Sequence, residues 1–194
     1  AIEAGQPVGT FTPWERLPPD TDVLFYEGLH GGYVGDEINI AGDMDLLIGV
    51  VPVINLEWIQ KIRRDTDERG YNPDDVARTI LRRMPDYVNH IIPQFSRTDV
   101  NFQRVPLVDT SKPFAGREIP APDESLAVVH FNEHSCVRVN FDMLIARLPG
   151  AFQSHAQTLV VPGTLMEDAM ELMFRPMIQK LMLERAAALA REPS

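Results

Sequence analysis

Four charged residues with helical spacing lie in residues 55–69, which the sequence predicts to be a helix. At about 100° per residue, Lys61, Arg64 and Asp65 share an arc of about 100°, and Arg69 lies close beside it. Cations hold phosphate oxygens, and a carboxylate among them can help to hold a metal ion or orient an acceptor hydroxyl. The spacing is therefore typical of a site for a phosphorylated ligand, although an exposed helix face with salt bridges would show it too.

Glu27 is a second candidate, because it follows the apolar run Val23–Tyr26, which the sequence predicts to be a buried strand. A carboxylate at the carboxyl end of such a strand faces the crevice where α/β sheets bind ligands. Mg²⁺ prefers hard oxygen ligands, so Glu27 is a candidate metal residue, with an ordinary surface glutamate as the alternative.

Arg82 and Arg83 form a third candidate on the next predicted helix. Adjacent helical residues lie about 100° apart, so this pair can serve two partners but cannot clamp one. Binding of an anion, a contact between subunits and a solvated helix face all fit the pair.

Several well-known site motifs do not occur in the 194 residues. There is no G-x-x-x-x-G-K-[ST] phosphate loop, no G-x-G-x-x-G after a strand and no H-E-x-x-H. Cys136 is the single cysteine, so neither an internal disulfide nor a cysteine-based zinc site is expected.

The net charge of −10 argues against general attraction to nucleic acid or to an anionic membrane surface. Seven of the 18 basic residues are nevertheless concentrated in one stretch, namely Lys61, Arg63, Arg64, Arg69, Arg78, Arg82 and Arg83. A local cationic cluster on an acidic protein favours a small anion as the partner. No apolar run approaches the roughly 20 residues of a membrane helix, and no signal peptide is visible, so a cytoplasmic protein without a membrane partner is expected.

The order of predicted elements indicates an α/β fold in a single domain covering residues 1–194. Apolar runs predict buried strands at 23–26 and 45–53, of the kind found in parallel sheets, and further strands at 100–108 and 126–131. Helices are expected at 55–69 and 72–87. A long C-terminal helix should follow a capping box of Thr164 and Glu167, and Pro176 should kink or divide it.

Several long strings of this sequence closely resemble bacterial phosphoribulokinase. The similarity runs along almost the whole chain and is strongest from Asp22 to Thr110. The strings are Phe25–Gly31, Ile48–Ile62, Arg64–Asp65, Arg69–Tyr71, Leu81–Tyr87, Pro93–Ser96 and Asn101–Pro106. The resemblance implies a P-loop-kinase-like fold, with a mixed, mainly parallel sheet flanked by helices. It places this chain in the C-terminal two-thirds of the kinase domain, without the N-terminal strand–P-loop–helix and the general base.

The resemblance also implies an activity, which is the transfer of the γ-phosphoryl group of ATP to ribulose 5-phosphate. The product, ribulose 1,5-bisphosphate, enters carbon fixation in the Calvin cycle. Mg²⁺ as cofactor and a homo-oligomeric state are implied as well. The 194-residue chain alone is expected to be inactive without a P-loop. A non-catalytic sugar-phosphate-binding or regulatory subunit is the alternative, whereas a uridine-kinase-like relative fits the strings poorly.

For the first group of residues, the resemblance implies catalytic roles. Lys61 and Arg64 match catalytic cations that face the phosphates of ATP and of the sugar. Asp65 matches a carboxylate that is important for catalysis through the metal. Glu27 matches a metal-associated acid at the end of a strand.

For the remaining residues, the resemblance implies binding and regulation. Arg69 and His30 match positions that bind the sugar phosphate substrate. Arg82 and Arg83 match an arginine pair linked to activity or its regulation.

One departure concerns allosteric control. Some bacterial members respond to NADH, which the resemblance therefore suggests as an allosteric effector. In this chain His130 and His155 stand where arginines linked to that activation are expected. The sequence thus departs from the family pattern at the positions on which an NADH response depends.

Overall fold

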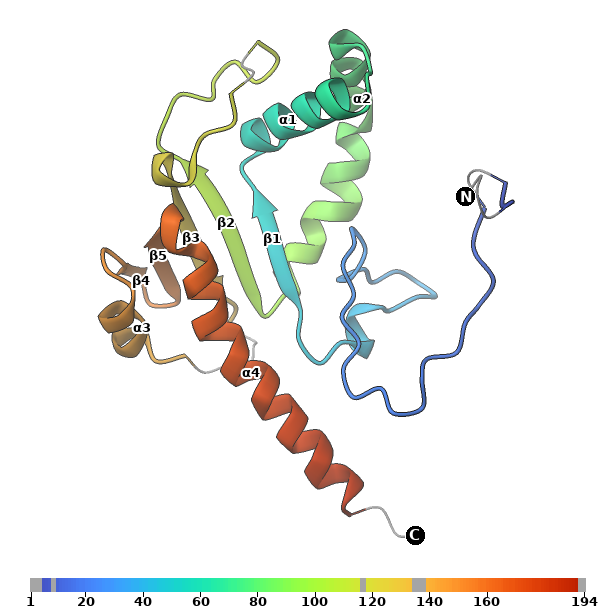
Figure 1. Ribbon diagram of the computed structural model, residues 1–194, viewed down its shortest axis with the longest axis vertical. Coiled ribbons are helices and arrows are strands. Elements are labelled where there is room, and N and C mark those ends of the chain that lie inside the picture. The colour runs from blue at the N-terminus through green and yellow to red at the C-terminus, as the bar shows by residue number, and fades with distance from the viewer. Residues whose placement is uncertain (1–4, 8–9, 116–117, 134–138, 192–194) are drawn as a thin grey trace.

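A five-stranded sheet forms the centre of the molecule in the computed structural model, which describes residues 5–7, 10–115, 118–133 and 139–191 (Figure 1). The strands lie in the order β1-β2-β3-β5-β4. Their bounds are β1 Ile48–Pro52, β2 Val100–Pro106, β3 Ser125–Phe131, β4 Phe152–His155 and β5 Thr158–Pro162.

The prediction of a mainly parallel sheet was wrong. Only β1 and β2 pair in parallel, whereas β2–β3, β3–β5 and β4–β5 are antiparallel. A parallel pair needs a long crossover, and the helical segment between β1 and β2 supplies one. A tight turn joins β4 directly to β5, so this pair returns antiparallel.

The structure contains helices between the strands of the sheet, as predicted for an α/β fold. The main ones are α1 Ile54–Arg63, α2 Pro73–Asp86, α3 Phe141–Arg147 and α4 Met166–Leu189. Two π-helical segments, η2 Arg64–Glu68 and η3 Tyr87–Ile91, continue α1 and α2, and the 3-10 helix η4 Ile92–Ser96 follows η3. Three short 3-10 turns complete the set: η1 Ala41–Asp43, η5 Pro122–Glu124 and η6 Gly163–Leu165.

The break between α1 and α2 has a simple local cause. Gly70 has a φ of +72°, a left-handed conformation that glycine adopts without strain and that ends a helix. Two residues later, the Asn72 side chain accepts a hydrogen bond of 2.9 Å from the backbone N–H of Asp74 and so caps α2.

The main core lies between one face of the sheet and the helices α3 and α4. Val100 and Phe102 of β2 are buried there with Met173 of α4, and Phe102 meets Phe174 edge to face at 5.2 Å. Because side chains alternate along a strand, Asn101 faces the other side, where it donates to the Phe95 carbonyl of η4. The segment 87–96 therefore covers the opposite face near β1 and β2 (Figure 1).

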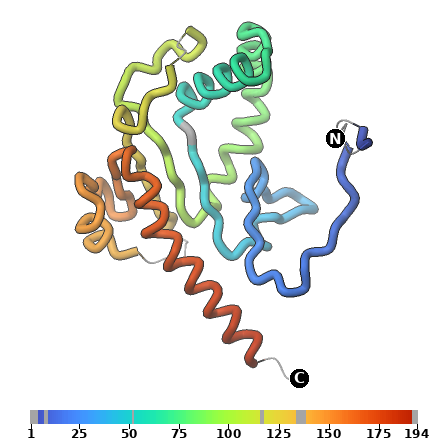
Figure 2. The backbone as a smooth tube through the Cα atoms, in the orientation of Figure 1, coloured from blue at the N-terminus to red at the C-terminus, as the bar shows by residue number. Residues whose placement is uncertain are grey.

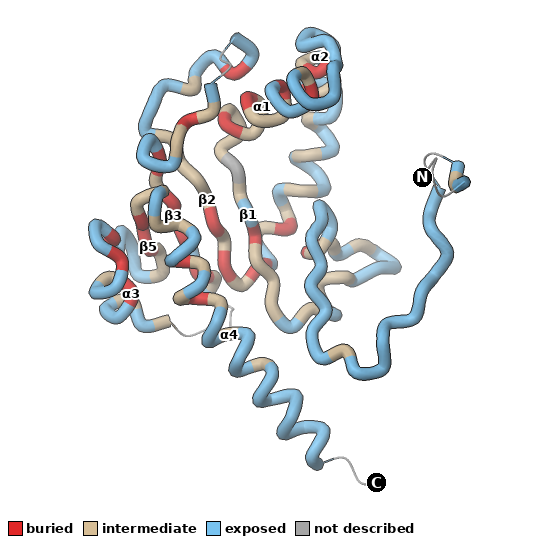
Figure 3. Tube along the Cα trace, viewed as in Figure 1, coloured by how far each residue is buried: buried red, intermediate tan, exposed pale blue. Residues whose placement is uncertain are grey.

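The predicted strand at Val23–Tyr26 was also wrong. These residues form irregular chain outside the sheet (Figures 2 and 3). Phe25 is 82% exposed. An apolar run becomes a strand only where a neighbouring strand takes its backbone hydrogen bonds. Among the described residues, no strand pairs with this segment.

The C-terminal helix differs from its prediction in two respects. The 3-10 turn η6 occupies residues 163–165, so α4 begins at Met166 without a side-chain cap, and the capping box at Thr164 is not formed. Pro176 lies within one continuous helix and does not divide it. Among the described helices, none combines the length and the hydropathy that a membrane-spanning helix requires.

The core predicts a large stability difference between two leucines. Leu159 in β5 is fully buried, so Leu159→Ala should lower the free energy of unfolding by about 2–5 kcal/mol through lost burial and a residual cavity. Leu183 in α4 is 71% exposed, and Leu183→Ala should change it by about 0.5 kcal/mol or less. Urea unfolding of both variants measures the difference, and equal losses would contradict the assignment of the core.

Candidate active site

The carboxyl end of β1 leads directly into α1, so this helix starts at the end of the parallel strand pair. Ligands of α/β sheets bind beside the carboxyl ends of strands. After Arg63 the helix widens into the π-helical segment η2, which contains Asp65. Short π-helical insertions are frequent at functional sites. The helix predicted at 55–69 is therefore present, with this local change of pitch.

Asp65 is the centre of an ion cluster. Its side chain is only 7% exposed. Lys61 Nζ lies 2.5 Å from Oδ2, while Arg64 Nε and Arg69 Nη1 lie 3.2 Å and 3.0 Å from Oδ1. The structure thus brings together all four residues that the helical spacing had grouped.

The three cations are more exposed than the carboxylate that holds them. The exposed fractions are 33% for Lys61, 48% for Arg64 and 54% for Arg69. Three positive groups meet one carboxylate, so the cluster carries an excess of positive charge that is open to solvent. This arrangement can bind a phosphate group with charge-assisted hydrogen bonds.

Asp65 remains ionised because of its partners. Burial by itself would raise its pKa, but the hydrogen bonds from Lys61 and Arg64 and their positive charges together bring the pKa below its ordinary value. The carboxylate is therefore a permanent anchor for the cations at neutral pH.

Glu57 extends the cluster by one helical turn and was missed by the sequence analysis. It precedes Lys61 by four residues, and its Oε2 atom is buried without a hydrogen-bond partner. Burial raises the pKa of Glu57, against the effects of a hydrogen bond with Tyr87 and of the Lys61 charge. Burial and the Glu57 charge raise the pKa of Tyr87 to about 12. The repeated four-residue spacing of Glu57, Lys61 and Asp65 was the signal that could have found it.

Glu27 and His30 lie in a separate loop. Both are exposed, and the His30 ring meets Tyr33 edge to face at 6.3 Å. No hydrogen bond or ion pair between this loop and the Asp65 cluster is present in the described part of the chain. The structure therefore does not bring these two candidates into contact with the cations.

Arg82 and Arg83 also lie outside the cluster. Both are exposed on α2, and within the described ranges neither forms an ion pair, whereas Arg78 of the same helix pairs with Asp75. Their proposed role in activity or regulation stays a prediction.

The donor set for Mg²⁺ is limited. No group of three or more His, Cys, Asp or Glu side chains that could hold a metal occurs among the residues described. A carboxylate offers about four lone-pair positions, and the Asp65 cations take three of them, so Asp65 can offer a metal about one more contact. Glu27 is exposed in a separate loop and can offer a ligand of its own. Mg²⁺ commonly binds one or two carboxylates together with substrate phosphates and water, so a single carboxylate of this chain fits such a site.

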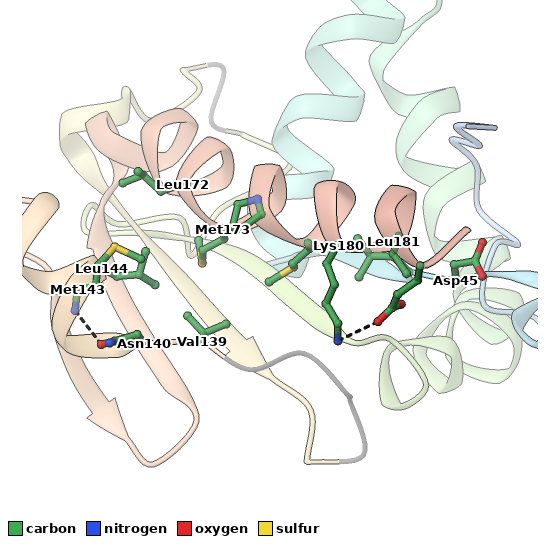
Figure 4. A pocket seen from close by; sticks show the side chains of 13 residues that line it. Asp45, Val139, Asn140, Met143, Leu144, Leu172, Met173, Lys180 and Leu181 are labelled. Atoms are coloured by element: carbon green, nitrogen blue, oxygen red, sulfur yellow. Dashed lines mark hydrogen bonds and ion pairs between the residues drawn. The ribbon is translucent and has the colours of Figure 1, made fainter. Parts of the chain in front are cut away.

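A cavity of about 380 Å³ lies elsewhere, between α3, α4 and the residues that precede β1 (Figure 4). Its lining is mostly apolar and includes Val139 and Met173, with Asp45 and Asn140 among the polar groups. Since Asp45 precedes β1 and the cluster follows it, this cavity is separate from the cationic site.

The two neighbouring carboxylates Asp65 and Asp67 should differ in their effect on stability. Asp65→Asn should lower the free energy of unfolding at pH 7 by about 1–3 kcal/mol, because hydrogen bonds to charged groups are lost. Asp67 is exposed and lies 3.6 Å from Arg63, so Asp67→Asn should cost at most about 1 kcal/mol.

The pH dependence gives a second readout for Asp65. Its pKa is lower in the folded state, so its contribution is complete above the ordinary value of 3.8 and is lost as the pH falls through the folded-state pKa. The difference between wild type and Asp65→Asn in denaturant melts should therefore shrink below pH 3.8. A difference that does not change with pH would contradict the role of the charge.

Comparison with known proteins identifies the family. Residues 7–111 match the model of the Phosphoribulokinase / Uridine kinase family. A phosphoribulokinase of Cupriavidus necator is 60% identical over 188 residues, which cover 97% of this chain and 64% of that protein. A probable phosphoribulokinase of Escherichia coli is 56% identical over 94% of this chain and 62% of its own length.

A solved structure shows the same fold. The phosphoribulokinase from Rhodobacter spheroides superposes with a TM-score of 0.83 at 51% identity, over 93% of this chain and 64% of that one. The chain thus spans somewhat less than two-thirds of the length of these relatives. With the family model matching more than half of its residues, the chain belongs to the phosphoribulokinase/uridine kinase family.

Proposed function

We propose that this chain is part of a phosphoribulokinase, which transfers the γ-phosphoryl group of ATP to ribulose 5-phosphate. The observation that carries the proposal is the cluster in which buried Asp65 holds Lys61, Arg64 and Arg69, on the helical segment that follows β1. The two relatives of this name described above, from Cupriavidus necator and Escherichia coli, are 60% and 56% identical over nearly the whole chain, which supports the substrate choice.

The cluster suits phosphoryl transfer in particular. In this reaction the bond between the γ-phosphorus and its bridging oxygen breaks, and a bond to the acceptor hydroxyl oxygen forms, while charge spreads over the equatorial oxygens. Cations already held by Asp65 can stabilise that charge without rearranging during the reaction. We assign Lys61 and Arg64 to the ATP phosphates on this basis, with Asp65 as the carboxylate that positions them.

Mg²⁺ would neutralise charge on the ATP phosphates when it is bound. Glu27 and the remaining position on Asp65 are the groups of this chain that would hold it. Arg69, the most exposed of the three cations, and His30 are assigned to the phosphate of the sugar substrate.

The wider features of the proposal follow from the resemblance. We propose that the 194 residues form part of one kinase domain in a cytoplasmic homo-oligomer. Arg82 and Arg83 are assigned to activity or its regulation. A response to NADH is not part of the proposal, because His130 and His155 replace the expected arginines.

Asp65→Asn should lower kcat by at least about 10²-fold in an intact kinase that carries this sequence. The change keeps the shape of the side chain but removes the charge that fixes the cations, and losses of this size accompany the removal of one stabilising group. The assay follows formation of ADP and ribulose 1,5-bisphosphate, with Asp67→Asn as the control.

A near-normal kcat of Asp65→Asn would make Asp65 a structural ion-pair residue. A wild-type enzyme that phosphorylates uridine but not ribulose 5-phosphate would contradict the proposed substrate. Binding of ribulose 5-phosphate without any transfer in the intact protein would favour the non-catalytic subunit instead.

Arg69→Ala should raise KM for ribulose 5-phosphate by roughly 10- to 150-fold and leave KM for ATP much less affected. A lost charge-assisted bond to phosphate typically costs about 1.5–3 kcal/mol. Arg69→Lys keeps the charge but loses the planar fork, so it should recover only part of the loss. Arg63→Ala is the matched control, since Arg63 is exposed and pairs with Asp67.

Equal changes in the two KM values for Arg69→Ala, or no change in either, would remove Arg69 from the sugar phosphate site. Lys61 and Arg64 would then carry the anion-binding role without it.

A further inference from the structure

Gln94 of η4 connects two parts of the chain that are far apart in sequence. Gln94 is buried, with only 6% of the residue exposed. Its Nε2 donates to the Leu29 carbonyl at 2.9 Å and to the His90 carbonyl at 2.6 Å, and its Oε1 accepts from the Gly32 N–H at 3.1 Å. The loop of residues 27–32 is thereby joined to the helical segment 87–96.

The hydrogen bonds specify both the residue type and its orientation. The amide offers two donors to two carbonyls and one acceptor to one N–H, so every contact matches. A reversed amide would place Oε1 against the carbonyls of Leu29 and His90. Neither glutamate, which lacks the amide donors, nor leucine, which has no polar atoms, can make all three bonds.

Close packing reinforces the hydrogen bonds at the same place. Gly32 is buried, and a Cβ atom added there would lie 3.1 Å from the Gln94 Cβ and 3.4 Å from its carbonyl oxygen. A side chain at this position would push the loop or η4 away by a few tenths of an ångström. The loop therefore rests directly on Gln94.

Apolar burial contributes little to holding this loop. Leu29 in the loop is 71% exposed, and Phe25, which precedes the loop, is 82% exposed. A few residues before the loop, the Arg185 side chain of α4 donates to the Asp22 carboxylate and to the Thr21 carbonyl at 3.3 Å each, but this contact is exposed. Gln94 is thus the buried attachment of the loop.

The segment that Gln94 belongs to also reaches the cationic cluster. Tyr87 of η3 interacts with Glu57 of α1, which lies one helical turn before Lys61. The segment 87–96 is therefore linked to the loop through Gln94 and to α1 through Tyr87. It is a physical connection between two groups of site residues that do not touch one another.

We propose that Gln94 is a positioning residue, which holds the loop with Glu27 and His30 in a defined place relative to the Lys61–Asp65 cluster. The proposal rests on the proposed function, because the loop matters for catalysis only if these residues meet the metal and the sugar phosphate. Misplacement of a catalytic group by about 1 Å can cost about 10²-fold in rate, so one amide can have a large effect.

The kinetic test uses Gln94→Leu and Gly32→Ala in the intact kinase, which disturb the same contact from its two sides. Both should lower kcat/KM for ribulose 5-phosphate by at least about 10-fold. Gln94→Glu keeps the volume but places a carboxylate oxygen against the Leu29 and His90 carbonyls, so it should lower kcat/KM at least as much as Gln94→Leu. Gln153→Leu is the control, since Gln153 is exposed on β4 and, among the described residues, its side chain donates only to the Ala156 carbonyl.

Hydrogen–deuterium exchange gives a readout that does not depend on activity. The Gly32 N–H is itself bonded to Gln94, so its exchange should be at least about 10-fold faster in Gln94→Leu, while Val129 in β3 should be unaffected. Faster Gly32 exchange with unchanged kinetics would show a merely structural amide and overturn the proposal. Unchanged Gly32 exchange would overturn it as well.

The same experiment separates the two proposals. If the wild-type enzyme does not phosphorylate ribulose 5-phosphate, the proposed function fails. Faster Gly32 exchange in Gln94→Leu would in that case still support Gln94 as the attachment of the loop.

Discussion

The buried carboxylate of Asp65 is the interaction on which the rest of the site depends. Without it, three cations would face one another on adjacent turns of one helical segment, and mutual repulsion would spread them. A carboxylate that is removed from water needs such partners, and cations that are paired in this way are held in place before a ligand arrives. Burying Asp65 costs free energy, but the same burial holds the three cations in place for a phosphate group.

The ion cluster in turn depends on how α1 is placed and shaped. Charges alternate along one line of the helix, from Glu57 to Lys61, Asp65 and Arg69, each four residues from the last. Exposed pairs with this spacing contribute only about 0.3–0.5 kcal/mol each, so they could not impose the geometry alone. Burial of Asp65 and Glu57 against neighbouring segments strengthens the interactions along this line of charges. The π-helical turn allows both Arg64 and Arg69 to reach the same Asp65 oxygen, Oδ1.

Features that depend on local periodicity could be predicted from the sequence. The shared arc of Lys61, Arg64 and Asp65 follows from the helical repeat, and the Asn72 cap and the Gly70 break follow from residue chemistry. Features that depend on residues distant in the sequence could not be predicted. The run Val23–Tyr26 is as apolar as a strand, but nothing in it says whether a neighbour will pair with it. The antiparallel direction of β3 depends on its pairing with β2 and β5, and Gln94 bonds a loop more than 60 residues earlier.

The two attachments of the segment 21–32 differ in strength, and this difference decides how its residues are held. The Arg185–Asp22 pair is exposed, with 47% and 67% of the side chains accessible, and such pairs contribute about 0–1 kcal/mol. Each of the three bonds of buried Gln94 contributes about 0.5–1.5 kcal/mol, and breaking one leaves a buried polar group unsatisfied. Position is therefore controlled at the Gly32 end, next to His30. Glu27 lies between the two attachments, five residues before Gly32, so the Gln94 contact limits the positions that its carboxylate can take.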